Sequence, residues 1–439
     1  MEALIMVAQL LLGLGLLVFV HELGHFLAAK AFGIKVEKFY VFFDFGNTKI
    51  FSKKVGDTEY GIGWFPLGGY VKIVGMVDES MDKDQLEKPP EDYEFRSKPA
   101  WQRFIVLVAG VVMNVIVGIL IFAGSTLYFD KEYVPISAVE NGIYAHEIAR
   151  NAGLKTGDKI TKINGRSFDR AKEVESLKML FGAKVTLERN GQTKEIQLPD
   201  NLFLEIGRGG GQFISFLNVP FEVSEVMPGT PAEEFGLQKG DQFLRLDTVE
   251  ISSFGHFSET LSGYAGQEIE IEVKRSGETF TDYVKVGEDG RLGFFPNPLM
   301  DYDTKPYTVF NSLKYGTIDG FEAIYYNAIG LGKVFTGQVK ATESIQSPIG
   351  IATIYGGVWD WKRFWYLTGL ISFILAFMNI LPIPALDGGH IMFIFIEVIQ
   401  GKPVSQKTME KAQGVGMVLL LLLMAFAFGN DIYKLITGG

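Results

Sequence analysis

The stretch His-Glu-Leu-Gly-His at residues 21–25 decides how the rest of this sequence is interpreted. It lies in an apolar run, residues 4–29, in which Glu22 is the only charged residue. Residues four apart share one face of a helix, so His21 and His25 can hold one metal ion while Glu22 takes a proton from the attacking water. Imidazoles and a carboxylate are costly inside a membrane span and therefore indicate function. The stretch predicts a metal site with a catalytic base.

Composition indicates a membrane protein that also has soluble parts. Of 439 residues, 47% are hydrophobic and 21% are charged, and the mean hydropathy is +0.18. The net charge of −10 argues against a nucleic-acid partner, because phosphate binding needs a basic face. The chain has no cysteine, which excludes disulfides and thiolate metal sites. Zinc would therefore have to be held by histidine and carboxylate.

Four apolar segments predict a multi-pass α-helical membrane protein embedded in a lipid bilayer. The first lacks a basic leader, so we interpret it as a membrane helix and not as a cleavable signal peptide. Lysine and arginine follow the first segment, precede the second and occupy the loop at 391–413, which indicates that these parts are cytoplasmic and that both termini lie on the other side. The predicted spans are residues 1–30, 104–129, 364–390 and 414–435.

The segment between the first two spans, residues 31–103, contains short stretches rich in aromatic and β-branched residues, which are typical of strands. Residues 61–70 predict a β-hairpin that is too apolar for a free loop. We interpret it as membrane-associated, with an edge to which an extended substrate could add as a strand. A small sheet that only packs on itself is equally consistent with the pattern.

Two further features concern the second span and the segment before the third. In the second span, Ala109 and Gly110 are small residues that let helices approach closely in lipid. Asn114 is strongly polar in mid-span, and an interhelical hydrogen bond explains it more simply than a direct catalytic role. Residues 291–363 predict a linker with an amphipathic helix at 310–333.

The polar region after the second span contains an internal repeat. Residues 152–160 realign on residues 235–243, each copy having Gly-Leu, two further residues, Gly-Asp and an alternating strand. This pattern resembles PDZ domains of the bacterial type, so we predict two α+β PDZ modules at 130–203 and 210–290. They would bind extended peptides or act as a passive screen. We expect the two histidines of these modules, His146 and His256, to be surface or structural residues and not metal ligands.

The third span is broken near its end. Pro382 and Pro384 unwind a helix, which a membrane tolerates only where protein or a cavity covers the freed backbone. The topology returns this end of the span to the depth of the His-Glu-Leu-Gly-His stretch. Asp387 can therefore supply a third ligand and leave the fourth tetrahedral position open, as a catalytic zinc site requires. His390 is the competing candidate.

Together, these motifs resemble the site-2-type intramembrane zinc metalloproteases. The resemblance rests on residues 21–25, on Pro-Leu-Gly-Gly-Tyr-Val-Lys at 66–72, on the tandem repeat and on residues 379–388. It implies one Zn²⁺ per chain, bound by His21, His25 and Asp387, with Glu22 activating water. It also implies that substrate is presented as a strand and held near a developing oxyanion by a further set of residues: Gly68, Gly69, Tyr70, Val71 and Asn379.

The resemblance further implies hydrolysis of a peptide bond in the transmembrane segment of a single-span substrate, an anti-sigma factor or a remnant signal peptide. The protein would lie in a bacterial inner membrane with its PDZ modules and both termini in the periplasm. Where the family has proline after Ala109-Gly110, this chain has Val111, so the resemblance does not predict the local helix geometry at this position.

Two other functions fit the same motifs. One is a membrane-anchored quality-control metalloprotease that cuts soluble or misfolded chains. The other is a non-enzymatic PDZ scaffold or a metal carrier. A structural metal site is normally closed by four protein ligands, so a fourth ligand such as His390 would favour the scaffold.

Overall fold

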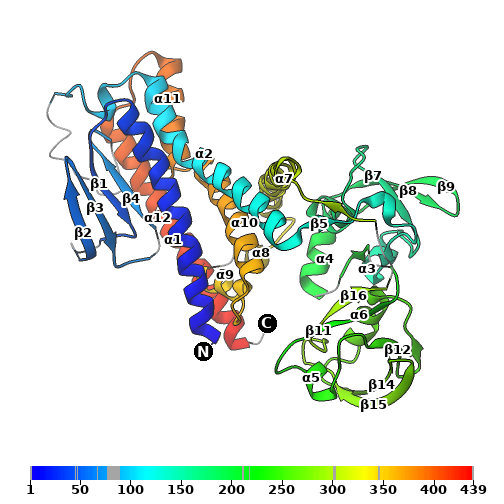
Figure 1. Ribbon diagram of the computed structural model, residues 1–439. Helices are drawn as coiled ribbons and strands as arrows, with labels where there is room; N and C mark the ends of the chain where they lie inside the picture. The colour runs from blue at the N-terminus through cyan, green and yellow to red at the C-terminus, as the bar shows by residue number, and fades with distance from the viewer. Residues whose placement is uncertain are drawn as a thin grey trace. The chain divides into compact units, whose positions relative to one another are not determined.

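A computed structural model describes residues 2–44, 46, 48–66, 68–76, 89–209, 212–216, 218–299, 303–344 and 347–437 (Figure 1). The chain forms two compact units. One, called here the membrane unit, comprises Met1–Asp130 and Thr308–Gly439, and the other, the soluble unit, comprises Lys131–Tyr307.

Within the described residues, four helices of the membrane unit are long and apolar enough to cross a membrane. This agrees with the predicted multi-pass helical class. α2, α10 and α12 begin before the spans predicted from the sequence, because polar residues at their N-terminal ends continue the helical hydrogen bonding outside the apolar stretch. The helices are α1 (Glu2–Ala31), α2 (Ala100–Ser125, continued by a π-helical turn at Thr126–Asp130), α10 (Trp361–Ile380) and α12 (Gln406–Thr437).

The predicted third span is not one helix. α10 ends at Ile380, and a new helix, α11, runs over Asp387–Gln400, so the predicted loop at 391–413 is wrong over its first ten residues. Glycines at the start of α11 make this reversal possible. A Cβ on Gly388 would collide with the carbonyl of Leu381, and one on Gly389 would lie 2.6 Å from the carbonyl oxygen of Ile383.

A four-stranded sheet lies beside α1 in the membrane unit, in the order β2-β3-β1-β4 (Figure 1). The central strand β1 pairs in parallel with β3 and antiparallel with β4. The predicted hairpin at 61–70 is therefore wrong, because its two arms lie on opposite sides of β1; Leu67 is outside the described residues. β4 is an edge strand next to α1. The strands are β1 (Val36–Val41), β2 (Lys49–Val55), β3 (Thr58–Gly63) and β4 (Tyr70–Ile73).

The segment before α10 contains α7 (Val309–Phe335), which includes the predicted amphipathic helix, and the short helices α8 (Ala341–Ser344) and α9 (Pro348–Tyr355). A capping box begins α7, since Thr308 Oγ accepts from Asn311 N and Asn311 Oδ1 accepts from Thr308 N. One face of α7 packs on α2 and α10, where a Cβ on Gly320 would collide with the Phe373 ring.

The soluble unit contains two separate hydrophobic cores, which define a first module (residues 131–216) and a second module (residues 221–299). The predicted C-terminal boundaries of the modules, residues 203 and 290, are too early, because the last strand of each module pairs with a strand near the beginning of that module. β10 pairs with β6, and β16 pairs with β11. The elements are β5 (Glu132–Tyr133), β6 (Tyr144–Ala145), α3 (Glu147–Asn151), β7 (Lys159–Ile163), β8 (Lys184–Arg189), β9 (Gln192–Gln197), α4 (Leu202–Gly209), β10 (Ile214–Ser215), β11 (Phe221–Val226), α5 (Pro231–Phe235), β12 (Gln242–Leu246), β13 (Val249–Glu250), α6 (Phe254–Ser262), β14 (Glu268–Arg275), β15 (Glu278–Lys285), β16 (Phe294–Pro298) and β17 (Lys305–Pro306).

The Gly-Asp pair of the repeat has the same structural function in both modules. In the first, Asp158 accepts hydrogen bonds from Arg189 Nε and Nη2 at 2.7 and 2.6 Å. In the second, Asp241 accepts from Arg275 Nε and Nη2 at the same two distances. Both aspartates are almost fully buried. The aspartate of the sequence repeat thus forms, in both modules, an ion pair that joins the turn before one strand to the end of another strand.

Candidate metal centre

The residues of the His-Glu-Leu-Gly-His stretch lie on α1 where it packs closely against α2. His21 and His25 are 9% and 7% exposed, so both side chains face the interior. A Cβ on Gly24 would collide with the carbonyl of Ala109, and one on Gly110 would collide with His25 Nε2. Glycine at both positions lets the two helices approach and leaves room for the imidazoles.

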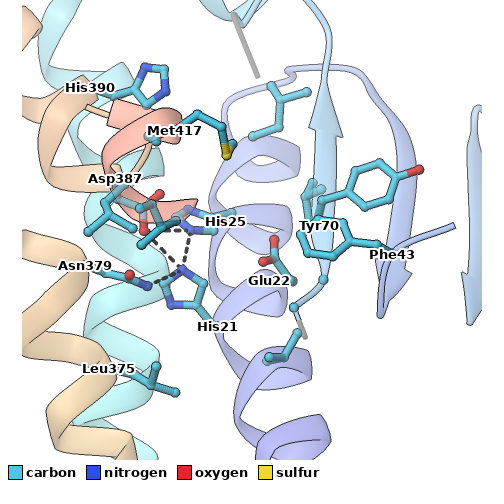
Figure 2. Close-up of a pocket in the computed structure, with 18 of the residues that line it drawn as sticks. His21, Glu22, His25, Phe43, Tyr70, Leu375, Asn379, Asp387, His390 and Met417 are labelled. Carbon is cyan, nitrogen blue, oxygen red and sulfur yellow. Dashed lines mark hydrogen bonds and ion pairs between the residues drawn. The ribbon is translucent and has the colours of Figure 1, made fainter. Parts of the chain in front are cut away.

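Asp387, the first residue of α11, brings a carboxylate to these two imidazoles (Figure 2). Its Oδ2 lies 3.1 Å from His21 Nε2 and 3.4 Å from His25 Nε2, and the two Nε2 atoms are 3.1 Å apart. Zinc bonds of about 2.0–2.1 Å in tetrahedral geometry separate neighbouring ligand atoms by about 3.3–3.4 Å. The three atoms therefore have the spacing of three ligands around one zinc ion, with a fourth position open.

The hydrogen bonding of these groups also fits a cation. His25 Nδ1 lies 2.8 Å from the carbonyl oxygen of Val106, which accepts only if Nδ1 carries the proton. The lone pair of His25 is then on Nε2 and points at Asp387. Within the described part of the chain, Asp387 Oδ2 is buried and makes no regular hydrogen bond. Lone pairs that meet without a proton donor repel one another unless a cation lies between them.

Glu22 lies beside this group and next to the sheet. In Figure 2 its carboxylate lies between the histidines and Tyr70 of β4, and the backbone of Val71 hydrogen-bonds to it. A cavity of about 640 Å³ contains Glu22 together with both histidines and Asp387. Its other walls are largely apolar side chains of α1, α10 and α12, including Leu17, Leu375 and Leu421.

The residues predicted to bind substrate line the same cavity. Gly68, Gly69, Tyr70 and Val71 form one wall, at the free edge of β4. Asn379, near the end of α10, lies on the other side with Nδ2 3.2 Å from His21 Nε2. The structure thus brings all the predicted site residues around one space, and their functions in the reaction stay predictions.

His390 lines this cavity but is not part of the three-residue group. Its Nε2 lies 2.7 Å from the side-chain nitrogen of Gln413 on α12. His146 and His256 belong to the soluble unit.

Sequence reasoning missed several residues of the cavity. Lys38 and Asp44 form an ion pair at 2.9 Å in the cavity wall, and Tyr70 donates a hydrogen bond to Asp44 at 2.8 Å. Burial opposes ionisation of Asp44, but the hydrogen bonds from Lys38 and Tyr70 hold its pKa below the usual range. Gly110 was identified only as a helix-packing residue. In a single sequence nothing distinguishes a glycine that faces a histidine from one that faces lipid.

Comparison with known proteins identifies the family. The profile of peptidase family M50 matches residues 9–423. A protein of Yersinia pestis named protease RseP is 29% identical over 99% of this chain and 100% of its own length. The regulator of sigma-E protease RseP of Escherichia coli is 29% identical over 98% of each chain. A relative from Neisseria meningitidis, whose name places it among the zinc metalloproteases, is 28% identical over 96% of this chain and 97% of its own.

Proposed function

The chain belongs to peptidase family M50 and is a site-2-type intramembrane zinc metalloprotease, and we propose that it hydrolyses a peptide bond within the transmembrane segment of a single-span substrate. One observation carries the proposal. Three ligand atoms spaced for zinc face one another beside a glutamate, in a cavity whose walls are formed by candidate membrane spans.

One zinc ion per chain would be held by His21, His25 and Asp387, and when bound it supplies a Lewis acid for the scissile carbonyl. Glu22 would take the proton from the attacking water and pass it to the leaving amine, which balances the hydrolysis. Asn379 would hold the substrate carbonyl through Nδ2 and donate to the oxygen as negative charge develops there.

The edge of β4 would bind the substrate in extended form. A transmembrane helix has its carbonyls closed into hydrogen bonds, so it must unwind before water can attack one of them. Pairing with an edge strand replaces the hydrogen bonds that the helix loses. Because Val71 of β4 already hydrogen-bonds to Glu22, a strand added here would pass directly beside the base.

The helices and the family place the protein in a bacterial inner membrane, where it acts on membrane proteins. We propose that both termini and both modules of the soluble unit are periplasmic. The modules would be PDZ domains that bind peptide or restrain access. The proposed substrates are an anti-sigma factor or a remnant signal peptide.

The other functions considered are less well supported. In the described residues His390 lies beside Gln413 and outside the three-residue group, so no fourth protein ligand closes the site as a structural metal would require. That observation argues against a scaffold or a carrier. The enclosure of the site by span helices argues against a quality-control protease whose substrates are soluble.

The test uses Glu22→Gln, which removes the base but retains the size of the side chain. We expect the purified variant to keep the zinc content of the parent and to lose cleavage of a single-span substrate reconstituted in the same vesicles. The two measurements are zinc per chain and product on gels. Cleavage at the parental rate would contradict Glu22 as the base, and a parent without zinc would contradict the metal site.

A further inference from the structure

Asn114 lies in the middle of α2, fully buried and pointing at the back of a candidate metal ligand. Its Nδ2 is 3.3 Å from His21 Nδ1, the ring nitrogen that faces away from Asp387. Its Oδ1 is buried and has no hydrogen-bond partner among the described residues. A buried amide oxygen without a partner costs free energy, so its position calls for an explanation.

Comparison with His25 shows which hydrogen bond His21 lacks. His25 binds through Nε2, and its Nδ1 donates to the carbonyl of Val106 at 2.8 Å, which fixes the tautomer and the plane of the ring. His21 needs the same arrangement if its Nε2 is to present a lone pair. Its Nδ1 must then carry a proton and find an acceptor, and the amide nitrogen of Asn114 cannot accept.

Rotation of the Asn114 amide by half a turn about its last side-chain bond exchanges Oδ1 and Nδ2 and moves no other group. We propose that Asn114 presents Oδ1 to the Nδ1–H of His21 and so positions this histidine as a metal ligand. This single change gives the unpartnered oxygen a donor and gives His21 the tautomer that metal binding requires. The inference rests on the proposed metal site and adds to it a fixed orientation for His21.

The surroundings of Asn114 hold it rigidly enough for this function. Ser372 of α10, itself fully buried, donates a hydrogen bond to the backbone carbonyl of Asn114 at 2.7 Å. One turn along α2 on either side, glycines sit against bulky neighbours: Gly110 against the two imidazoles and Gly118 against the Phe373 ring. Asn114 is thus fixed by α10 on one side while its side chain faces α1.

The experiment measures zinc affinity by competition with a chelator on the full-length protein in detergent, for the parent and three variants. Asn114→Leu removes the acceptor and keeps the branching and the number of heavy atoms of the side chain. Asn114→Asp retains an acceptor and cannot donate. The matched control is Thr368→Val. Thr368 lies on the same helix as Ser372 but away from the histidines, and the substitution removes its buried hydrogen bond with Tyr355.

We expect Asn114→Leu to bind zinc about 10–100-fold more weakly than the parent, as loss of a group that orients a metal-bound histidine does elsewhere. Asn114→Asp should stay within a few-fold of the parent, and Thr368→Val should match the parent. Parental affinity in Asn114→Leu would overturn the inference, and so would Asn114→Asp binding as weakly as Asn114→Leu. Equal losses in Asn114→Leu and Thr368→Val would assign the effect to packing and overturn it too.

A second measurement covers the case in which Asn114→Leu does not fold. The chain has only five histidines, so nitrogen NMR of histidine-labelled, zinc-loaded protein can resolve each ring. We expect the Nδ1 resonance of His21 to be that of a protonated nitrogen and to shift in Asn114→Asp, while that of His25 stays in place. An unchanged His21 resonance would overturn the inference. If the parent itself binds no zinc, it is the proposed metal site that fails.

Discussion

Each of the two units contains an aspartate with a buried carboxylate oxygen, and the groups around these two aspartates differ. In the soluble unit, Asp241 is completely buried and accepts two hydrogen bonds from Arg275 and one from the backbone of Gln238 at 2.8 Å. Asp387 in the membrane unit lies among two imidazoles, and its inner oxygen has no regular hydrogen bond within the described residues.

This difference distinguishes a carboxylate that is paired within the fold from one that is available to bind a cation. Where the chain itself neutralises a buried carboxylate, removing either partner destabilises the fold, because it leaves a buried group without compensation. A carboxylate oxygen that is buried without a donor among the described residues, as Oδ2 of Asp387 is, requires a cation from outside. Asp158 and Asp241 are of the first kind, and Asp387 is of the second.

The largest effect should follow from Asp387→Asn. An amide is a poor zinc ligand, so we expect zinc to be lost, with a fall in affinity greater than the 10–100-fold that loss of an orienting partner causes. Cleavage should be lost with it, while the unfolding temperature of the metal-free protein should stay the same or rise. Zinc analysis and thermal unfolding with and without chelator check this, and a large loss of stability in the metal-free state would contradict the comparison.

The opposite outcome is expected from Asp241→Asn. Hydrogen bonds to charged groups contribute about 1.5–3 kcal/mol each to stability, so the second module should become less stable by about 2–3 kcal/mol. Zinc content should not change. Hydrogen exchange on the full-length protein should be faster than in the parent in β12 and β14 and unchanged in α1. Loss of zinc in this variant would mean that the two units are not independent in the way the comparison assumes.

A smaller effect is expected from Gly110→Ala, because its Cβ would press on the histidines. Overpacking of this kind costs about 1–3 kcal/mol, which corresponds to roughly 5–150-fold in zinc affinity. The matched control is Gly124→Ala on the same helix, where a Cβ meets no atom within 4 Å. If both variants bind zinc equally well, close packing behind the ligands does not matter.

The smallest effect concerns acid stability where the two modules meet. Glu259 accepts hydrogen bonds from Arg150 and Tyr144; burial opposes ionisation, but these bonds lower the pKa of Glu259 to about 2. Because the folded pKa is below the unfolded value of about 4.3, this carboxylate stabilises the fold above about pH 5. The contribution is lost as the pH falls toward 2.

Thermal unfolding of the parent and of Glu259→Gln between pH 7 and pH 3 tests this. The two curves should converge as the pH falls below about 5, since the parent loses what the variant never had. Burial lowers the pKa of the neighbouring His146 and the charge of Glu259 opposes this shift, so His146 adds an acid-dependent loss of stability that is larger in Glu259→Gln than in the parent. A constant difference between the curves down to pH 3 would contradict the contribution assigned to Glu259.

Most of the metal site could be predicted from the sequence, because its spacing is local. His21, Glu22 and His25 lie within one helical turn, and Pro382 and Pro384 mark the break that brings Asp387 back to their depth. The predicted hairpin failed for the opposite reason. Its residues are adjacent in sequence, but β1, which comes earlier in the chain, pairs between them. Strand pairing depends on partners that local patterns do not identify.

The amino-acid sequence predicts the class of protein, a pair of histidines with a candidate base, a candidate third ligand and the repeat. These follow from hydropathy, helical periodicity and turn chemistry, which act over a few residues. The packing of helices and strands, which the sequence does not reveal, brings Asp387 to ligand spacing from the histidines, the free edge of β4 beside Glu22 and Asn114 behind His21. Those contacts join residues that are tens to hundreds of positions apart, and the packing of one helix against another sets their distances.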